Sequence, residues 1–463
     1  MHSNSLSKSL DDLQELVLKI VKPSKSEIER TTALANMVME RLKKVVPKGV
    51  EIILAGSVAR GTQIRGSSDI DIFILFPKNL EERKMEMKGI EVAKRIVSKN
   101  GKEHYVVKYA EHPYIQVFFD DYGMNVDIVP AYKINSAKER GSAVDRTQLH
   151  NLFINDNLTP RQKDEVKVLK AFLKEHNIYG AEARVSGFSG YLCELLIYQF
   201  GSFVEFLKGI SNIKLPFVAE PLHREFKGAD DSNLIAKKFN SKFIVIDPTD
   251  PERNVAANVS MESLSRLVLA SRLLLKEPSK KTFFRKPYSD INSRLKLESI
   301  AKKLNLEIIA VKIKVPNIAD DIIWQQVQKL KRQLEQHLAK EGFAPEISLQ
   351  NLYDNYAVIA FFTRRSESGA SVKEGPNVFM KSAVDNFMDS HNDALFTVHC
   401  DRIGVLSMAQ HKSAFGLLKW LINSGIGQMP SYIKRNNISI VKGAIDEQAS
   451  KAILQAYMEK FSI

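Results

Sequence analysis

The chain has 463 residues, of which 44% are hydrophobic and 26% are charged. This balance is typical of a globular protein and excludes a fibrous repeat, a wholly disordered chain and a small disulfide-stapled module. Lysine and arginine number 67 against 54 acidic residues, a formal net charge of +13, so we expect a polyanionic partner. Two cysteines, Cys193 and Cys400, cannot form a disulfide framework or a thiolate metal cluster. No stretch is typical of a signal sequence or a membrane span, which predicts a cytoplasmic protein.

Helical and strand patterns alternate along the chain. Residues 9–45 carry apolar positions at helical spacing and predict two helices separated at Pro23. Residues 51–130 contain five short β-rich runs between turn-forming residues, which predict one mixed sheet. The helical period returns from about 145 to 210, and a short strand at 243–248 precedes one more helix.

The last part of the chain is predicted to be α+β. Strands at 307–315 and 355–363 flank an amphipathic helix, and a helix and two strands are expected beyond them. The run PSKKTFFRKP before this part is interpreted as a linker. We therefore expect an α+β protein with three domains: 1–140 with the mixed sheet, 141–277 mostly helical, and 278–463.

The densest group of candidate site residues lies between 56 and 76. Gly56 and Ser57 follow an apolar strand, where a small residue allows a sharp turn that presents N–H groups and a hydroxyl to a phosphate. Asp69 and Asp71 are two apart on the next strand, so both carboxylates lie on one face. Like charges this close repel, and the usual reason to hold them together is a divalent cation. Mg²⁺ is the expected cofactor, because it accepts carboxylate, water and phosphate oxygens.

A third carboxylate is expected from a neighbouring strand. Asp127 lies in the run NVDIVP, which is predicted to form a hairpin with YIQVFF across DDYG and to lie beside the strand of Asp69 and Asp71. Three such acids could hold two metal ions, one activating an attacking hydroxyl and one stabilising a leaving pyrophosphate. A D-x-D pair alone is common on solvated strand edges. Its combination with the Gly-Ser turn, Arg60 and the later Asp127 indicates nucleotidyl transfer.

This combined pattern resembles the nucleotidyltransferase superfamily, which is built on a polymerase-β-like palm. Within it, the chain is similar to the archaeal, class I CCA-adding enzymes, the tRNA nucleotidyltransferases that build or repair the 3′ CCA end. VDRTQLH at 144–150 and the stretches at 166–197 and 246–258 share the similarity, which covers about residues 1–275. Further on, GPNVFMKSAVDNF at 375–387 is the most suggestive motif. The resemblance implies a palm, a helical nucleotide-binding domain and a C-terminal α+β region that binds tRNA.

The resemblance also assigns roles to individual residues. Asp69, Asp71 and Asp127 match the metal-binding, catalytic acids, although the first is often Glu in the family and Asp69 is one methylene shorter. Ser57 and Arg60 match positions that contact the incoming triphosphate. The remaining nucleotide contacts are matched by His150, Lys170 and Tyr179, and by Arg253 as the arginine that reads the base.

Each of these assignments has a simpler structural alternative. Lys170 belongs to a series of four lysines at helical spacing, 163, 167, 170 and 174, that forms either a ridge for the triphosphate or a solvated face. His150 could be a structural histidine, and Tyr179 a core aromatic residue with its hydroxyl bonded to backbone. Arg253 could form a local ion pair with Asp250 or Glu252.

Two regions with aromatic residues, one at the linker and one beyond it, also have two possible interpretations. The segment from 276 to 288 mixes lysines and an arginine with aromatic residues, so it either binds nucleic acid or is a solvated connector. Trp420 is expected in the core rather than as an RNA platform. The segment's basic residues are Lys276, Lys280, Lys281, Arg285 and Lys286, and its aromatic residues are Phe283, Phe284 and Tyr288.

The resemblance implies addition of C, C and A to the 3′ end of tRNA from CTP and ATP, with release of pyrophosphate. The alternatives are another template-independent RNA nucleotidyltransferase, such as a poly(A) polymerase, and an inactive RNA-binding protein on the same scaffold. The chain has no P-loop signature, no nucleophile elbow around Ser189 and no histidine spacing typical of zinc. The oligomeric state stays open, a homodimer included.

Overall fold

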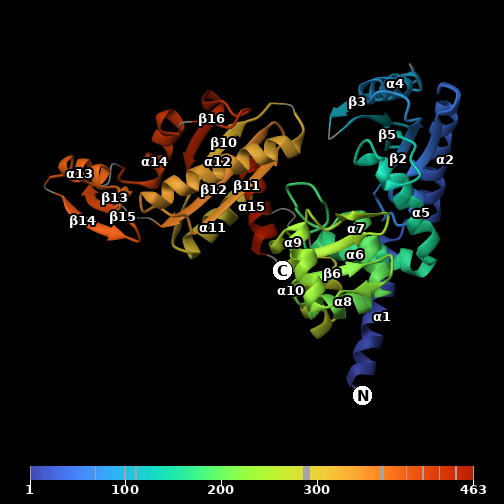
Figure 1. Ribbon diagram of the computed structural model, residues 1–463, viewed down its shortest axis with the longest axis horizontal. Coiled ribbons are helices and arrows are strands. Elements are labelled where there is room, and N and C mark those ends of the chain that lie inside the picture. Colours follow the sequence, from blue (N-terminus) through green and yellow to red (C-terminus); the bar gives the residue numbers. More distant parts are fainter. Residues whose placement is uncertain are drawn as a thin grey trace. The chain divides into compact units, whose positions relative to one another are not determined.

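The chain folds into two compact units in the computed structural model, residues 1–286 and 287–462 (Figure 1). The first unit contains both of the first two predicted domains, and the division falls inside the predicted linker. The predicted limits at 140 and 277 stay predictions. The structure describes residues 2–67, 69–98, 101–109, 112–284, 292–316, 318–364, 370–392, 394–408, 411–426, 428–443 and 446–461.

The first unit begins with two helices and a five-stranded mixed sheet, which confirms the predicted palm. The sheet order is β1-β2-β5-β4-β3, in which β2 and β5 are parallel and the other neighbours antiparallel. The hairpin of β4 and β5 across DDYG is also confirmed. These elements are α1 (His2–Val21), α2 (Lys25–Lys43), β1 (Glu51–Ala55), β2 (Asp69–Phe76), β3 (Glu103–Tyr109), β4 (Pro113–Phe119) and β5 (Met124–Tyr132), with α4 (Glu82–Arg95) between β2 and β3.

The alternation along β2 decides which way the sheet faces. Ile70, Ile72 and Ile74 are completely buried in a core that α2 and α4 complete. Because side chains alternate along a strand, Asp69 and Asp71 must lie on the opposite face. The isoleucines therefore orient the two carboxylates away from the helices.

The rest of the first unit is mostly helical, as predicted, and carries a small second sheet of order β7-β6-β8-β9. Its core includes Leu169, Leu196 and Leu267, none of which is exposed, and α1 packs here, against α6. The strands β6, β7 and β9 and the helix α9 were not predicted from the sequence. The elements are α5 (Thr147–Asn157), α6 (Pro160–Glu175), α7 (Gly190–Phe200), α8 (Phe203–Ser211), β6 (Phe217–Glu220), β7 (Glu225–Phe226), α9 (Ala229–Phe239), β8 (Phe243–Asp247), β9 (Asp250–Asn254) and α10 (Met261–Lys276).

One aromatic residue of the predicted linker, Phe283, is buried and does not offer its ring to bases. Phe283 is 2% exposed, and its ring packs against Phe172 and Phe203 with centroids 5.4 and 6.1 Å apart. Burial of this ring anchors the segment to the helical core, so the nucleic-acid interpretation is wrong for Phe283. Arg285, Lys286 and Tyr288 lie outside the described residues.

The second unit is α+β, as predicted, with one sheet of order β11-β12-β10-β16 and another of order β13-β15-β14. Helix α12 buries Val327, Leu330 and Leu334 against the larger sheet, and α11 and α15, which were not predicted, cover the sheet's other face. The elements are α11 (Ser293–Lys303), β10 (Leu306–Lys314), α12 (Asp320–Lys340), β11 (Ile347–Tyr353), β12 (Tyr356–Arg364), β13 (Ala370–Asn377), α13 (Lys381–Asp389), β14 (Leu395–His399), β15 (Arg402–Met408), α14 (Ala414–Trp420), β16 (Ile438–Lys442) and α15 (Glu447–Phe461).

Trp420 departs from its prediction, because its exposed fraction is 45%. Leu417 and Leu418 form the buried side of α14, and the indole lies at the end of that helix, beside the ring of His411. The core interpretation of Trp420 is therefore wrong. Among the described helices of both units, none combines the length and the apolar character that a membrane crossing requires.

Candidate active site

The strand register brings the three predicted acids together. Asp71 lies directly opposite Asp127 in the parallel pair of β2 and β5, and Asp69 lies opposite Asn125. Directly paired residues point to the same face of a sheet, so the three carboxylates share the face opposite the buried isoleucines. The predicted placement of Asp127 beside the strand of Asp69 and Asp71 is thus observed.

The turn after β1 fits closely against these carboxylates. Gly56 begins the short helix α3 (Gly56–Arg60) with a φ of +69°, a conformation that favours glycine. A Cβ atom at position 56 would lie 1.8 Å from Asp71 Oδ2, so any side chain there would displace the carboxylate. Ser57 follows in the same turn and is half-buried. The Gly-Ser turn and the acids therefore form one site, as the sequence predicts.

The negative charges of the three carboxylates are only partly compensated by positive groups. Burial and, after it, the negative charges of Asp127 and Asp69 raise the pKa of Asp71 to about 7, against the opposing charge of Arg60. Burial also raises the pKa of Asp127, against a hydrogen bond of 2.7 Å from Gln116 Nε2. The phenol pKa of Tyr114 is raised by burial and by all three carboxylates, so this side chain faces them too. A divalent cation would relieve the repulsion, and the carboxylate set suits one.

Another group of acidic and histidine side chains also lies close together in the first unit. Among the described residues, one group of three acidic or histidine side chains has ligand atoms all within 4.8 Å of one another, and it is Glu82, Glu86 and His112. There, His112 Nδ1 lies 2.9 Å from Glu86 Oε1 and 3.6 Å from Glu82 Oε1, so ion pairing accounts for that group.

Arg60 and Lys170, both predicted to contact the triphosphate, are buried around Glu194. Arg60 Nε lies 2.9 Å from Glu194 Oε2, and Arg60 Nη1 donates to Asn151 Oδ1 at 2.8 Å. Lys170 Nζ donates to the Thr62 carbonyl oxygen at 2.9 Å and lies 3.9 Å from Glu194 Oε1. Glu194 is completely buried on α7 and also accepts from the Thr62 hydroxyl.

The alternative of a solvated face is therefore wrong for two of the four lysines. Lys167 and Lys170 are 6% and 2% exposed, because α6 packs between α1 and α7 and is covered on both sides. Sequence reasoning also missed Glu194. The signal was present, since a single acid inside the apolar run YLCELLIYQF needs a buried partner.

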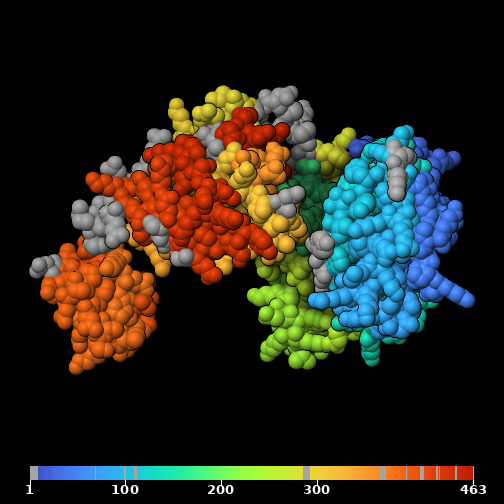
Figure 2. All heavy atoms as spheres, turned by 90° about the horizontal axis from the view of Figure 1, so that it is seen from above, coloured from blue at the N-terminus to red at the C-terminus, as the bar shows by residue number. Residues whose placement is uncertain are grey.

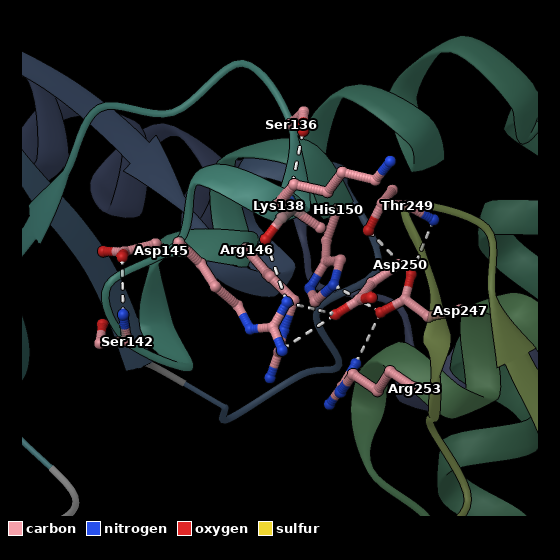
Figure 3. A network of polar contacts seen from close by, with 12 residues as sticks. Ser136, Lys138, Ser142, Asp145, Arg146, His150, Asp247, Thr249, Asp250 and Arg253 are labelled. Atoms are coloured by element: carbon pink, nitrogen blue, oxygen red, sulfur yellow. Dashed lines mark hydrogen bonds and ion pairs between the residues drawn. The ribbon is translucent and has the colours of Figure 1, made fainter.

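Asp247, at the end of β8, gathers two more of the predicted residues (Figure 3). His150 Nε2 lies 3.0 Å from Asp247 Oδ2, and Arg253 Nη1 donates to the same oxygen at 2.8 Å. The other carboxylate oxygen accepts from the hydroxyls of Tyr191 and Thr249 at 3.1 and 2.8 Å. Sequence reasoning missed Asp247, although an acid that closes an apolar strand was the available signal.

The ion pair of Arg253 differs from the local pair that its neighbours in the sequence suggest. Arg253 pairs with Asp247 rather than with Asp250 or Glu252, while Asp250 Oδ2 lies 3.2 Å from Nη1 of both Arg140 and Arg146. Burial lowers the pKa of His150, and Asp247 opposes this. Burial by itself would raise the pKa of Asp247, but His150, the Thr249 backbone N–H and Arg253 hold that pKa well below its usual range.

Tyr179 lies beside Lys170 at the beginning of α7. A Cβ atom at Gly190 would be 3.2 Å from the Tyr179 hydroxyl and 3.6 Å from Lys170 Nζ. The ring is half-buried, with Lys174 Nζ 5.4 Å from its centroid. The structure thus groups the predicted nucleotide contacts in two clusters, Arg60 with Lys170 at Glu194 and His150 with Arg253 at Asp247. Their roles in nucleotide binding stay predictions.

Divalent-cation binding is expected to depend on pH. Asp71 must lose its proton to ligate a cation and has a pKa of about 7 in the metal-free protein, so the association constant should rise about tenfold per unit up to that pH. The stability of the metal-free protein is expected to change in the opposite direction. Because the pKa of Asp71 is higher in the folded chain than in the unfolded chain, the free energy of unfolding should fall as the pH rises from about 4 to 7. Calorimetric Mg²⁺ titrations and melting temperatures across this range measure both. Asp71→Asn should flatten both, and wild-type profiles that are already flat would contradict the assignment.

Known proteins match the chain over nearly its whole length. Three family descriptions match successive parts: a nucleotidyltransferase domain at 36–150, the second domain of tRNA nucleotidyltransferases at 164–284, and the C-terminal domain of CCA-adding enzymes at 306–443. The CCA-adding enzyme of Methanocaldococcus jannaschii is 34% identical over 446 residues, which cover 94% of this chain and 96% of that protein. The CCA-adding enzyme of Sulfurisphaera tokodaii is 32% identical over 444 residues, 91% of this chain and 100% of that protein. The chain therefore belongs to the family of the archaeal CCA-adding enzymes.

Proposed function

We propose that this protein adds C, C and A in turn to the 3′ end of tRNA, using CTP and ATP and releasing pyrophosphate. The observation that carries the proposal is the register of β2 and β5, which sets Asp71 opposite Asp127 and keeps Asp69 on the same face, against the Gly56 turn. Membership of the family of CCA-adding enzymes supports tRNA as the substrate, since the relatives that match over most of their length are named CCA-adding enzymes.

The three aspartates are proposed to hold Mg²⁺. When bound, the ions would lower the pKa of the terminal ribose hydroxyl and neutralise charge on the phosphates. The protein's own part is positioning: Asp71 and Asp127 fix the reacting centre from two adjacent strands, and the Gly56 and Ser57 turn offers backbone N–H groups and a hydroxyl to the triphosphate. Such fixed dipoles stabilise developing charge without reorganising.

Arg60 and Lys170 are proposed to act on the triphosphate mainly by holding that turn. Lys170 donates to the Thr62 carbonyl oxygen, and the Thr62 N–H donates to the Ser57 carbonyl oxygen at 2.9 Å. This chain of contacts connects the lysine to the phosphate-facing serine. Arg253, positioned on Asp247, is proposed as the group that reads the base, and His150 and Tyr179 are proposed as further contacts to the nucleotide.

The second unit and the positive charge of the chain are proposed to bind tRNA. A net charge of +13 favours contact with RNA phosphates, so tRNA affinity should fall steeply with salt concentration. The cytoplasmic location and a homodimer remain predictions.

An incorporation assay tests the proposal. With tRNA lacking its CCA end, we expect two C additions from CTP alone and one further A when ATP is also present, while tRNA that already ends in CCA gains nothing. Long A tracts from ATP alone would establish a poly(A) polymerase instead. Binding of tRNA without any incorporation would establish the inactive RNA-binding alternative.

A further inference from the structure

The sheet face that carries the aspartates continues across two more strands. On β4, Gln116 lies opposite Asp127, and Phe118 lies opposite Asn125, two residues away along the strand. On β3, the edge strand, His104 lies opposite Phe118. Because directly paired residues point to the same face, His104 and Phe118 share the face of the acids.

His104 and Phe118 form a stacked pair of rings at the surface. Their centroids are 4.6 Å apart and their planes differ by 4°. The His104 side chain is 59% exposed, and Val106, next to it on the same face of β3, is 47% exposed. Helices α2 and α4 complete the core on the opposite face. The light blue part of the chain in Figure 2, to which β3 belongs, lies at the surface of the first unit.

Such a pair suits a nucleobase of any identity. Aromatic rings beside a basic side chain bind single-stranded ends by stacking, without hydrogen bonds that read the base. The same face of β3 also carries a basic side chain, Lys108, which lies four residues from His104, about 13 Å along the strand, and opposite Tyr114. By strand geometry, the ring pair is displaced from Asp127 by about 7 Å along the strands, the scale of one nucleotide.

The order of the strands indicates which substrate occupies this surface. The Gly56 turn follows β1 on one side of the acids, and the ring pair lies on β4 and β3 on the other side. In-line phosphoryl transfer needs the attacking and leaving oxygens on opposite sides of the reacting phosphorus. If the triphosphate lies at the Gly56 turn, then the attacking RNA end must approach from β4.

We propose that the His104 and Phe118 rings, on the sheet face of Asp127, form a stacking platform for a base at the 3′ end of the tRNA. The platform rests on the proposed function, because it takes its orientation from the triphosphate at the Gly56 turn. It is sequence-tolerant, so it can hold an end whose identity changes after each addition.

A comparison of neighbouring residues tests the platform. His104→Ala removes the outer ring, and Tyr105→Ala is the matched control, because Tyr105 is a 41% exposed aromatic residue on the same strand that points to the other face. For His104→Ala we expect the KM for tRNA to rise about fivefold or more, the effect of one lost base stack, while kcat and the KM for CTP and ATP change little. Tyr105→Ala should leave all these constants near wild type.

A second pair of measurements separates stacking from charge and from structure. His104 Nδ1 also lies 3.9 Å from Asp120 Oδ1, so His104→Phe, which keeps a ring and removes the imidazole nitrogens, should restore the KM for tRNA. A tRNA with 2-aminopurine at its 3′ end should lose fluorescence on binding to the wild type and less on binding to His104→Ala.

Three results would overturn the platform: equal constants for His104→Ala and Tyr105→Ala in an active enzyme, a change confined to the KM of CTP or ATP, or equal quenching by the wild type and His104→Ala. Failure of the proposed function is distinguishable, because it would appear as a wild type that incorporates nothing. The quenching experiment needs no turnover and decides the platform in that case as well.

Discussion

Asp71→Asn is expected to lower nucleotide incorporation by at least about a thousandfold, because removing one shared carboxylate forfeits several kcal/mol of metal-assisted charge stabilisation. The same substitution should not weaken the fold. Asp71 is held among like charges with a pKa raised to about 7, and a neutral amide of the same shape relieves that repulsion. We therefore expect a melting temperature equal to or above that of the wild type, together with loss of activity.

The control for this substitution is Asp121→Asn, which changes an aspartate in a turn of the same sheet. Asp121 lies in the turn between β4 and β5, and its side chain is 63% exposed and paired with Lys102. Its replacement should leave incorporation and melting temperature nearly unchanged. Normal incorporation by Asp71→Asn would refute the metal site, and equal losses in both variants would show that the assay reports on the sheet rather than on the site.

Glu194→Gln is expected to destabilise the protein by about 3 kcal/mol, because it leaves the buried cations Arg60 and Lys170 without a counter-ion. For a unit of 286 residues, the melting temperature should fall by roughly 5 °C. The loss should shrink at alkaline pH. Burial already lowers the pKa of Lys170 and Glu194 opposes this, so without Glu194 the lysine releases its proton more readily and then needs no partner.

Glu205→Gln is the matched control for Glu194→Gln. It removes the same charge from the neighbouring helix α8, where Glu205 pairs with Lys208 and both side chains are more than half exposed. Such a surface pair should contribute less than about 1 kcal/mol. Chemical denaturation and thermal melting measure both variants. Equal stability of Glu194→Gln and the wild type would show that Glu194 does not compensate the two cations.

The palm and its acids could be predicted from the sequence because they depend on local periods. The alternation in DIDIFILF decides by itself that Asp69 and Asp71 share a face, and the DDYG turn decides that β4 and β5 form a hairpin. The Gly-Ser turn could be recognised because glycine is needed wherever backbone and carboxylate approach so closely. Each of these features is encoded within about twenty residues.

The partners of the buried charges could not be predicted, because they depend on contacts between distant segments. Lys170 has the sequence pattern of an exposed ridge, and only the packing of α6 between α1 and α7 shows that it is enclosed. Arg253 has two acidic neighbours in sequence, yet it binds Asp247 across the hairpin of β8 and β9. Phe283 has basic neighbours, and the pocket that receives its ring is formed by Phe172 and Phe203.

The ion pair between Arg60 and Glu194 has a consequence for how the chain folds as it is synthesised. Two family descriptions divide the chain between residues 150 and 164, but the guanidinium on one side of that division is neutralised by a carboxylate on the other. A nascent palm therefore carries an uncompensated cation in its interior until the ribosome has delivered α7. The first 286 residues should accordingly mature as a single cooperative body, and the sheet is not a module that can be exchanged between proteins without its helical partner.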